Sequence, residues 1–138
     1  MDRLPHSDKI YVSGSKMPGA GRGVFAGVSI KKGETIEKCP LIMIPKHDTS
    51  NLRESILVTY FFYFGKDKEQ LAVVLGFGSL YNHSYTPNAV YKIKPKEERI
   101  DFVAIRDIKK DEEITFNYNS GTPNDKRPLW FEVSNPSK

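Results

Sequence analysis

The sequence predicts a single domain that is mainly β. Short runs rich in β-branched and aromatic residues recur along the chain between glycine, proline and asparagine turns, which is typical of several small strands. Two of these runs, residues 88–94 and 99–105, alternate between apolar and polar side chains around a Pro-Lys-Glu-Glu turn, which predicts a hairpin. With 138 residues, 38% of them hydrophobic, the chain is long enough to bury one core.

Further strands are expected in the first third of the chain. Residues 9–12 form a β-branched and aromatic run that ends at Ser13-Gly14, and residues 24–26 follow a glycine-rich segment. Residues 35–44 predict either one long strand or two shorter ones, because Pro40 lacks the backbone N–H that a central strand donates.

One helix is expected in the middle of the chain. Ser50 or Asn51 is its N-cap, and it runs toward Phe64 with Gly65 as its end. The period is ambiguous, because the Tyr-Phe-Phe-Tyr-Phe run at residues 60–64 fits a strand equally well.

The C-terminal part begins with an alternating run at residues 113–118, which predicts a strand ending at Tyr118. The segment after it, NSGTPNDKRP, is expected to be a loop because it is rich in Gly, Pro, Asn and Asp. It leads to Leu129, Trp130 and Phe131, whose apolar side chains need a surface to cover.

Two segments far apart in the chain resemble each other. VFAGVSIKKGETIE at residues 24–37 aligns with FVAIRDIKKDEEIT at residues 102–115, so that each carries an apolar residue followed by two lysines and an acidic turn. This pattern suits any surface elbow, and we favour convergence on a common turn over an internal repeat.

Composition excludes several classes of protein. Cys39 is the only cysteine, so an internal disulfide and a cysteine-built zinc site are excluded, and we predict no metal. No apolar run approaches the roughly 18 residues of a membrane-spanning helix, and MDRLPHSDKI lacks the apolar centre of a signal peptide. We therefore expect an intracellular protein that does not cross a membrane. Whether it is nuclear or cytoplasmic stays open.

The net charge of +4 is modest and the charges are mixed. Between Lys92 and Glu113 we count seven basic and seven acidic residues. Because no basic stripe interleaved with aromatic residues is present, direct binding to nucleic acid is not expected.

Two polar stretches are candidate ligand sites. Residues 19–27, GAGRGVFAG, are not a dinucleotide-binding fingerprint, because Val24 stands where the third glycine is required. Residues 75–91 place Asn82, His83 and Ser84 directly after a glycine-rich apolar run. This second stretch is either a polar turn between strands or a segment whose backbone and amide groups hold a ligand. No serine or cysteine nucleophile is identifiable as a partner of His83.

Three motifs occur in a fixed order along the chain: GxGxGVFA, a glycine-rich run into NHSxxPNA, and DEEITFNY. In this order they resemble the motifs of the SET-domain protein lysine methyltransferases, in particular of the compact viral and bacterial members. These motifs span residues 19–118. The resemblance implies a fold of several small antiparallel sheets with a C-terminal pseudoknot and one short helical insertion at about residues 46–70. We expect a single SET domain over residues 1–138, with a core at about residues 9–118 and a flanking segment, 119–138, that closes the site.

The resemblance also implies a cofactor, S-adenosyl-L-methionine, and the residues that bind it. The first glycine motif would hold the methionine end through its backbone, the Asn82 side chain would hydrogen-bond it, and His83 would receive the adenine largely through its main chain. The implied cofactor-binding residues are Ala20, Gly21, Arg22, Gly23, Asn82, His83, Tyr118 and Trp130.

Tyr118 aligns with the catalytic tyrosine of the family. Its hydroxyl would orient the substrate amine, and no side-chain general base is proposed, so water takes the proton. An aromatic channel for the lysine stem is implied at Tyr63, with Tyr60 as the rival, and at Phe131. Tyr91 stands where some members carry a residue that limits how many methyl groups are added.

Two departures from the family pattern affect this assignment. Asn119-Ser120 stands where many members have a glycine and, often, a second tyrosine, so that tyrosine is not identified. The cysteine-rich zinc segment that follows the domain in many members is absent, and Trp130 and Phe131 are expected to close the site in its place.

The sequence thus predicts an S-adenosylmethionine-dependent protein-lysine N-methyltransferase that acts on a histone tail or another lysine-bearing protein. The alternative is a SET-like module that has lost catalysis and binds peptides or proteins. A third interpretation, a small basic domain for nucleic acid, depends only on the pI of about 9.1. The resemblance to compact viral members also allows a homodimer.

Overall fold

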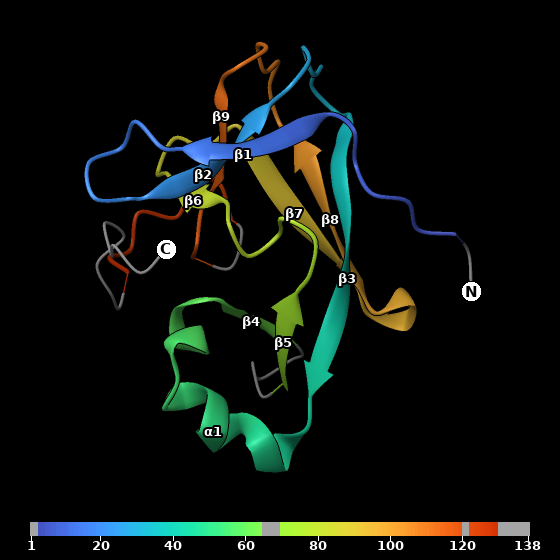
Figure 1. The fold of residues 1–138 in the computed structure, drawn as a ribbon, viewed down its shortest axis with the longest axis vertical. Coiled ribbons are helices and arrows are strands. Elements are labelled where there is room, and N and C mark those ends of the chain that lie inside the picture. Colours follow the sequence, from blue (N-terminus) through green and yellow to red (C-terminus); the bar gives the residue numbers. More distant parts are fainter. Residues whose placement is uncertain (1–2, 65–69, 120–121, 130–138) are drawn as a thin grey trace.

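A computed structural model describes residues 3–64, 70–119 and 122–129 of the chain. The strands fall into a four-stranded sheet of order β1-β2-β9-β6 and a five-stranded sheet of order β4-β5-β3-β8-β7 (Figure 1). The strands are β1 (Ile10–Gly14), β2 (Arg22–Ala26), β3 (Thr35–Ile44), β4 (Phe61–Phe64), β5 (Gln70–Val74), β6 (Asn82–His83), β7 (Ala89–Lys94), β8 (Arg99–Ala104) and β9 (Glu113–Phe116). The helices are η1 (Lys46–Asp48), α1 (Thr49–Arg53), η2 (Ile56–Thr59) and η3 (Pro95–Glu97). The prediction of a mainly β fold is confirmed.

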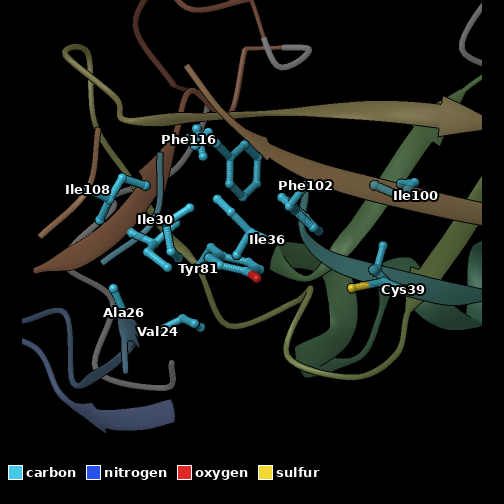
Figure 2. Packing of buried hydrophobic residues seen from close by; sticks show 14 of the residues in the cluster. Val24, Ala26, Ile30, Ile36, Cys39, Tyr81, Ile100, Phe102, Ile108 and Phe116 are labelled. Atoms are coloured by element: carbon cyan, nitrogen blue, oxygen red, sulfur yellow. The ribbon is translucent and has the colours of Figure 1, made fainter. Parts of the chain in front are cut away.

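The hydrophobic core joins the two sheets. Phe102 comes from β8, Phe116 from β9 and Tyr81 from the segment before β6, and their rings pack against one another around Ile36 and Ile30 (Figure 2). The ring centroids of Tyr81 and Phe102 are 4.4 Å apart, and those of Phe102 and Phe116 are 5.4 Å apart. Aromatic burial of this kind stabilises a core beyond its simple area.

Pro40 marks the point at which β3 changes partner. β3 is one continuous strand, but its pairing with β8 ends at Pro40 opposite Arg99, and its pairing with β5 begins at Leu41 opposite Val74. The Pro40 carbonyl accepts from the N–H of Leu75 at 2.9 Å. A proline is tolerated there because a donor is needed least where one ladder stops and the next begins.

The long helix expected from residue 50 to residue 64 is wrong beyond Arg53. α1 ends after five residues, and Ser55 takes an extended conformation in which its hydroxyl accepts from the N–H of Leu57. The aromatic run then forms β4, antiparallel to β5, so the strand alternative is right. The sequence pattern does not predict the strand at residues 70–74. α1 lies at the end of the molecule remote from β1 and β2 (Figure 1).

The two lysine-containing elbows lie against each other. Ile30 and Ile108 exchange backbone hydrogen bonds of 2.8 and 2.7 Å, and both side chains are buried. In each elbow the first lysine N–H donates to a glutamate three residues later, Glu34 or Glu112, at 3.0 Å. The similarity of the two segments is therefore a shared turn conformation, and the turns pair across the core.

β9 lies between β2 and β6, so the C-terminal motif runs beside the Asn82-His83 motif. The β6–β9 pairing is parallel, with Asn82 opposite Thr115 and His83 opposite Phe116. Asn88 secures this arrangement: its Oδ1 accepts from the N–H of Thr115 at 2.9 Å, and its Nδ2 donates to the Glu113 carbonyl at 2.9 Å. Asn88 is therefore not only a turn residue, because its side chain also holds the backbone of β9.

Within the three ranges that the structure describes, no helix is both long enough and apolar enough to cross a membrane.

We predict that Asn88→Ala lowers the free energy of unfolding by about 2 kcal/mol, because it leaves the buried Thr115 N–H and the partly buried Glu113 carbonyl of β9 without this partner. Chemical denaturation followed by circular dichroism measures the change. Asn51→Ala is the matched control, since Asn51 is exposed and makes only a 3.4 Å contact with Asp48. Equal stability of the two variants would contradict the role of Asn88.

Candidate active site

The amide of Asn82 lies at the centre of a small buried cluster. Its Nδ2 donates to the Arg22 carbonyl at 3.0 Å and to Glu113 Oε2 at 2.8 Å. Both partners only accept, so the orientation of the amide is fixed. Its Oδ1 is buried and has no hydrogen-bond partner within the described part of the chain. A buried amide oxygen without a donor costs free energy, which fits a ligand that brings an N–H group to this place.

The glycine motif surrounds the same cluster. Gly19 and Gly21 have positive φ values of 74° and 73°, which only glycine adopts without strain, and they turn the chain into β2. A Cβ at Gly23 would collide with the Glu113 carboxylate and lie 2.8 Å from Asn82 Nδ2. The Glu113 carboxylate and the Asn82 amide therefore pack directly against the Gly23 backbone, which is possible only because Gly23 has no side chain. Ala20, next to the two turn glycines, is buried.

Glu113 is a site residue that sequence reasoning missed. Its Oε2 holds Asn82, and its Oε1 accepts from the Ser15 hydroxyl at 2.7 Å. In the sequence it was one of three consecutive acidic residues of an elbow. The alternation of residues 113–118 was the available signal, because it places the Glu113 side chain on a defined face of β9.

His83 and Tyr118 are joined through backbone and ring contacts. The N–H of Tyr118 donates to His83 Nδ1 at 3.0 Å, so the imidazole is neutral with its proton on Nε2. The two ring centroids are 5.2 Å apart. The Tyr118 hydroxyl donates to the Tyr81 carbonyl at 2.5 Å. The backbone and the hydroxyl of Tyr118 are thus held by His83 and Tyr81, the two residues on either side of Asn82.

Aromatic rings form a wall beside Tyr118. Phe116 lies 5.1 Å from the Tyr118 ring, 5.5 Å from the Tyr91 ring and 5.8 Å from the Phe62 ring, measured between centroids. Phe62 also meets Tyr91 edge to face at 5.3 Å. Burial raises the pKa of Tyr91 to about 12, so its hydroxyl stays neutral at physiological pH.

Tyr63, the residue expected in the lysine channel, lies on the other face of β4. Neighbouring side chains of a strand point to opposite faces, and it is Phe62 that contacts Tyr91 and Phe116. The guanidinium carbon of Arg53 lies 5.9 Å from the Tyr63 ring centroid. The strand register thus brings Phe62 to the aromatic wall, and a channel role for Tyr63 stays a prediction.

The segment after β9 is tied to the site by side-chain amides and a phenol. Asn117 is fully buried and donates to the Asp125 carbonyl at 2.7 Å. The Arg127 carbonyl accepts from Asn119 Nδ2 at 2.6 Å and from the Tyr85 hydroxyl at 2.9 Å. Tyr85 in turn meets the His83 ring edge to face, with centroids 4.4 Å apart. Trp130 and Phe131 lie outside the described residues.

A family model of the SET domain matches residues 21–119. The chain belongs to the SET-domain family. The chain is 33% identical over 113 residues to a Schizosaccharomyces pombe histone-lysine N-methyltransferase specific for H3 lysine-37, covering 81% of this chain and 71% of the relative.

Solved SET structures have the same fold. A Plasmodium falciparum protein named as a histone methyltransferase is 36% identical with a TM-score of 0.63, covering 80% of this chain and 93% of that one. The Chaetomium thermophilum polycomb repressive complex 2 bound to S-adenosylmethionine is 27% identical with a TM-score of 0.70, covering 86% of this chain and 16% of that one. This chain is therefore an S-adenosylmethionine-dependent protein-lysine methyltransferase of the SET family.

The cluster around Asn82 fits the amino acid end of this cofactor. The buried Asn82 Oδ1 offers an acceptor to an ammonium group, and the lack of a side chain at Gly23 lets the Asn82 amide and the Glu113 carboxylate take up this arrangement. The Glu113 carboxylate accepts from Nδ2 of the same amide and so keeps Oδ1 turned away from it, as the acceptor left free within the described residues.

We predict that Gly23→Ala weakens binding of the cofactor product, S-adenosylhomocysteine, by about tenfold or more, because the new methyl group displaces the Asn82 amide. Isothermal titration calorimetry measures the affinity, and circular dichroism confirms the fold. Gly14→Ala is the matched control, since nothing lies within 4 Å of a Cβ at that position. Unchanged affinity in Gly23→Ala would remove this cluster from the cofactor site.

Proposed function

We propose that this enzyme methylates a lysine of a histone, with Tyr118 as its catalytic residue. The observation that supports this role is the fixed phenol of Tyr118. Its hydroxyl is held by the Tyr81 carbonyl and its backbone by His83 Nδ1, next to the cluster around Asn82. Rigid placement of this kind is what an orienting group requires.

The cofactor would be held by the backbone of residues 20–23, by the Asn82 side chain and by the main chain of His83. When bound, S-adenosylmethionine supplies a methyl group activated by a positively charged sulfur. Asn82 Oδ1 would accept from the ammonium group of the cofactor, while Glu113 keeps the Asn82 amide turned that way. Trp130 is proposed to cover the adenine.

The substrate lysine must lose its proton before it attacks, because its reference pKa is about 10.4. An apolar, aromatic surrounding favours the neutral amine, and the Phe62, Tyr91 and Phe116 rings provide such a surrounding beside Tyr118. Glu113 is occupied by Ser15 and Asn82, so we assign no side-chain base and the proton passes to water. With the cofactor bound, the Tyr118 hydroxyl would orient the amine toward the methyl group that the cofactor supplies.

The substrate channel is proposed to run along this aromatic wall. The aliphatic stem of lysine packs well on rings, and its charged end is attracted to their faces. Tyr63 and Phe131 remain proposed channel residues, and Tyr91 is proposed to limit the number of methyl groups transferred. The segment 119–138 is proposed to close the site around the cofactor and the lysine.

A histone substrate is proposed because both the Schizosaccharomyces pombe relative and the Plasmodium falciparum structure carry histone methyltransferase names. The net charge of +4 does not by itself attract a basic tail. We therefore propose that the groove for the peptide is locally acidic or that the target is less basic than a histone tail. A homodimer, as in the compact viral members that the sequence resembles, is proposed as well.

We predict that Tyr118→Phe lowers kcat on a histone H3 peptide by about a hundredfold or more, because the group that orients the amine is lost. Transfer of label from methyl-labelled cofactor measures the rate, and calorimetry with S-adenosylhomocysteine should show cofactor binding retained. Tyr11→Phe is the matched control, because it removes an exposed phenol hydroxyl that donates to Asp111 and belongs neither to the cluster around Asn82 nor to the aromatic wall. Full activity in Tyr118→Phe would show that the catalytic tyrosine is misassigned.

We further predict that Tyr91→Phe shifts the product toward more highly methylated lysine, because removal of a buried hydroxyl leaves room for an additional methyl group beside the aromatic wall. Mass spectrometry of the peptide after exhaustive reaction gives the distribution of mono-, di- and trimethyl-lysine. An unaltered distribution, with Tyr63→Phe altering it instead, would transfer this role to Tyr63.

A further inference from the structure

A carboxylate is buried on β3 close to the active site. Glu37 is 7% exposed. Its Oε1 accepts from the Tyr81 hydroxyl at 2.7 Å, and its Oε2 accepts from the backbone N–H of Phe77 at 2.9 Å. The described part of the chain contains no ion pair of Glu37. A buried carboxylate without a cation depends on its hydrogen bonds, so these two donors are firmly held.

The segment between β5 and β6 is wrapped closely around this carboxylate. Gly76 has a φ of 66°, and a Cβ there would lie 2.5 Å from Glu37 Oε2. Burial, and next the charge and hydrogen bond of Glu37, raise the pKa of the neighbouring Cys39 thiol. The thiol therefore stays neutral and adds no competing charge. Glu37 thus contacts the segment 75–81 at Gly76, Phe77 and Tyr81 and holds it in place.

Tyr81 connects this carboxylate to the catalytic residue. Its ring is 1% exposed and packs against Phe102, and its hydroxyl points toward the part of β3 that carries Cys39 (Figure 2). Burial, followed by the Glu37 charge, raises the pKa of Tyr81 well above its usual value. Its hydroxyl is therefore always a donor to Glu37. At its other end, the Tyr81 carbonyl accepts from the Tyr118 hydroxyl.

From this chain of contacts we infer that Glu37 is a positioning residue for Tyr118. The carboxylate fixes the Tyr81 side chain, the Tyr81 ring fixes its own backbone in the core, and the Tyr81 carbonyl fixes the direction of the Tyr118 hydroxyl. The inference depends on the catalytic role of Tyr118 proposed above. It differs from a purely structural role of Glu37, which would change stability and cofactor affinity and not the orientation of one phenol.

The test removes the Tyr81 hydroxyl alone. In Tyr81→Phe the ring and the carbonyl stay, and Glu37 loses one donor. We expect kcat on a histone H3 peptide to fall by about tenfold, because a small displacement of an orienting group is costly. We expect KM for the peptide and the calorimetric Kd for S-adenosylhomocysteine to be unchanged. Glu37→Gln, which presents an amide N–H₂ to one of the groups that donate to Glu37, should have the same effect. Tyr11→Phe is the control in both assays.

A double-mutant cycle then identifies the route of the effect. If Glu37 and Tyr81 act through Tyr118, Tyr81→Phe has no further effect on kcat in a Tyr118→Phe background, measured under single-turnover conditions at high enzyme concentration. Losses that multiply would overturn the inference. A loss of kcat that is matched by a loss of cofactor affinity would also overturn it, in favour of a structural role.

A spectroscopic measurement decides the question independently of activity. In protein labelled with ¹³C at tyrosine Cζ, the Tyr118 signal is assigned with Tyr118→Phe and reports the hydrogen bond of its hydroxyl. It should shift in Tyr81→Phe and in Glu37→Gln and should not shift in Tyr11→Phe. An unshifted signal overturns the inference. If Glu37→Gln fails to fold, Tyr81→Phe alone decides.

The catalytic proposal and the positioning inference fail in different ways. Full activity in Tyr118→Phe would refute the catalytic proposal. An inactive Tyr118→Phe together with a fully active Tyr81→Phe would refute only the positioning inference.

Discussion

The short strand β9 is held in place by buried side-chain amides as well as by its own ladder. Its backbone pairs with β2 through Val24 and Phe25 and with β6 through Asn82 and His83. Asn88 adds hydrogen bonds to the same backbone from the side. Because these groups are buried, each unpaired partner would cost more than an exposed hydrogen bond contributes. The position of Tyr118, two residues after β9, follows from this arrangement.

Neutral polar groups make up most of the active site. Asparagine amides orient the backbone, His83 accepts through a neutral imidazole, and burial keeps the hydroxyls of Tyr81 and Tyr91 protonated. The carboxylates of Glu37 and Glu113 are turned toward donors of the protein itself. Such an interior suits methyl transfer, since it can desolvate an amine without offering a group that competes with it for the activated carbon.

The sequence predicted the fold class, the family and most of the strands, because those depend on local alternation and on motifs that stand in order. It did not predict β5 or the short length of α1, since the pairing of the aromatic run with residues 70–74 is a tertiary effect that overrides local propensity. Nor did it single out Glu113 and Glu37. Their importance comes from burial beside Asn82 and Tyr81, and acidic residues in an elbow or an alternating strand look like surface charges in the sequence.

The distance along the chain between the two halves of the site has a consequence for biosynthesis. The Ser15 hydroxyl and the Glu113 carboxylate meet although the two residues are 98 positions apart in the sequence, and the backbone bonds between Ile30 and Ile108 also close a long loop. Contacts that close such loops form late in folding. A nascent chain on the ribosome therefore has no place for its cofactor until nearly the whole domain has emerged, and a fragment released early is inert rather than partly active.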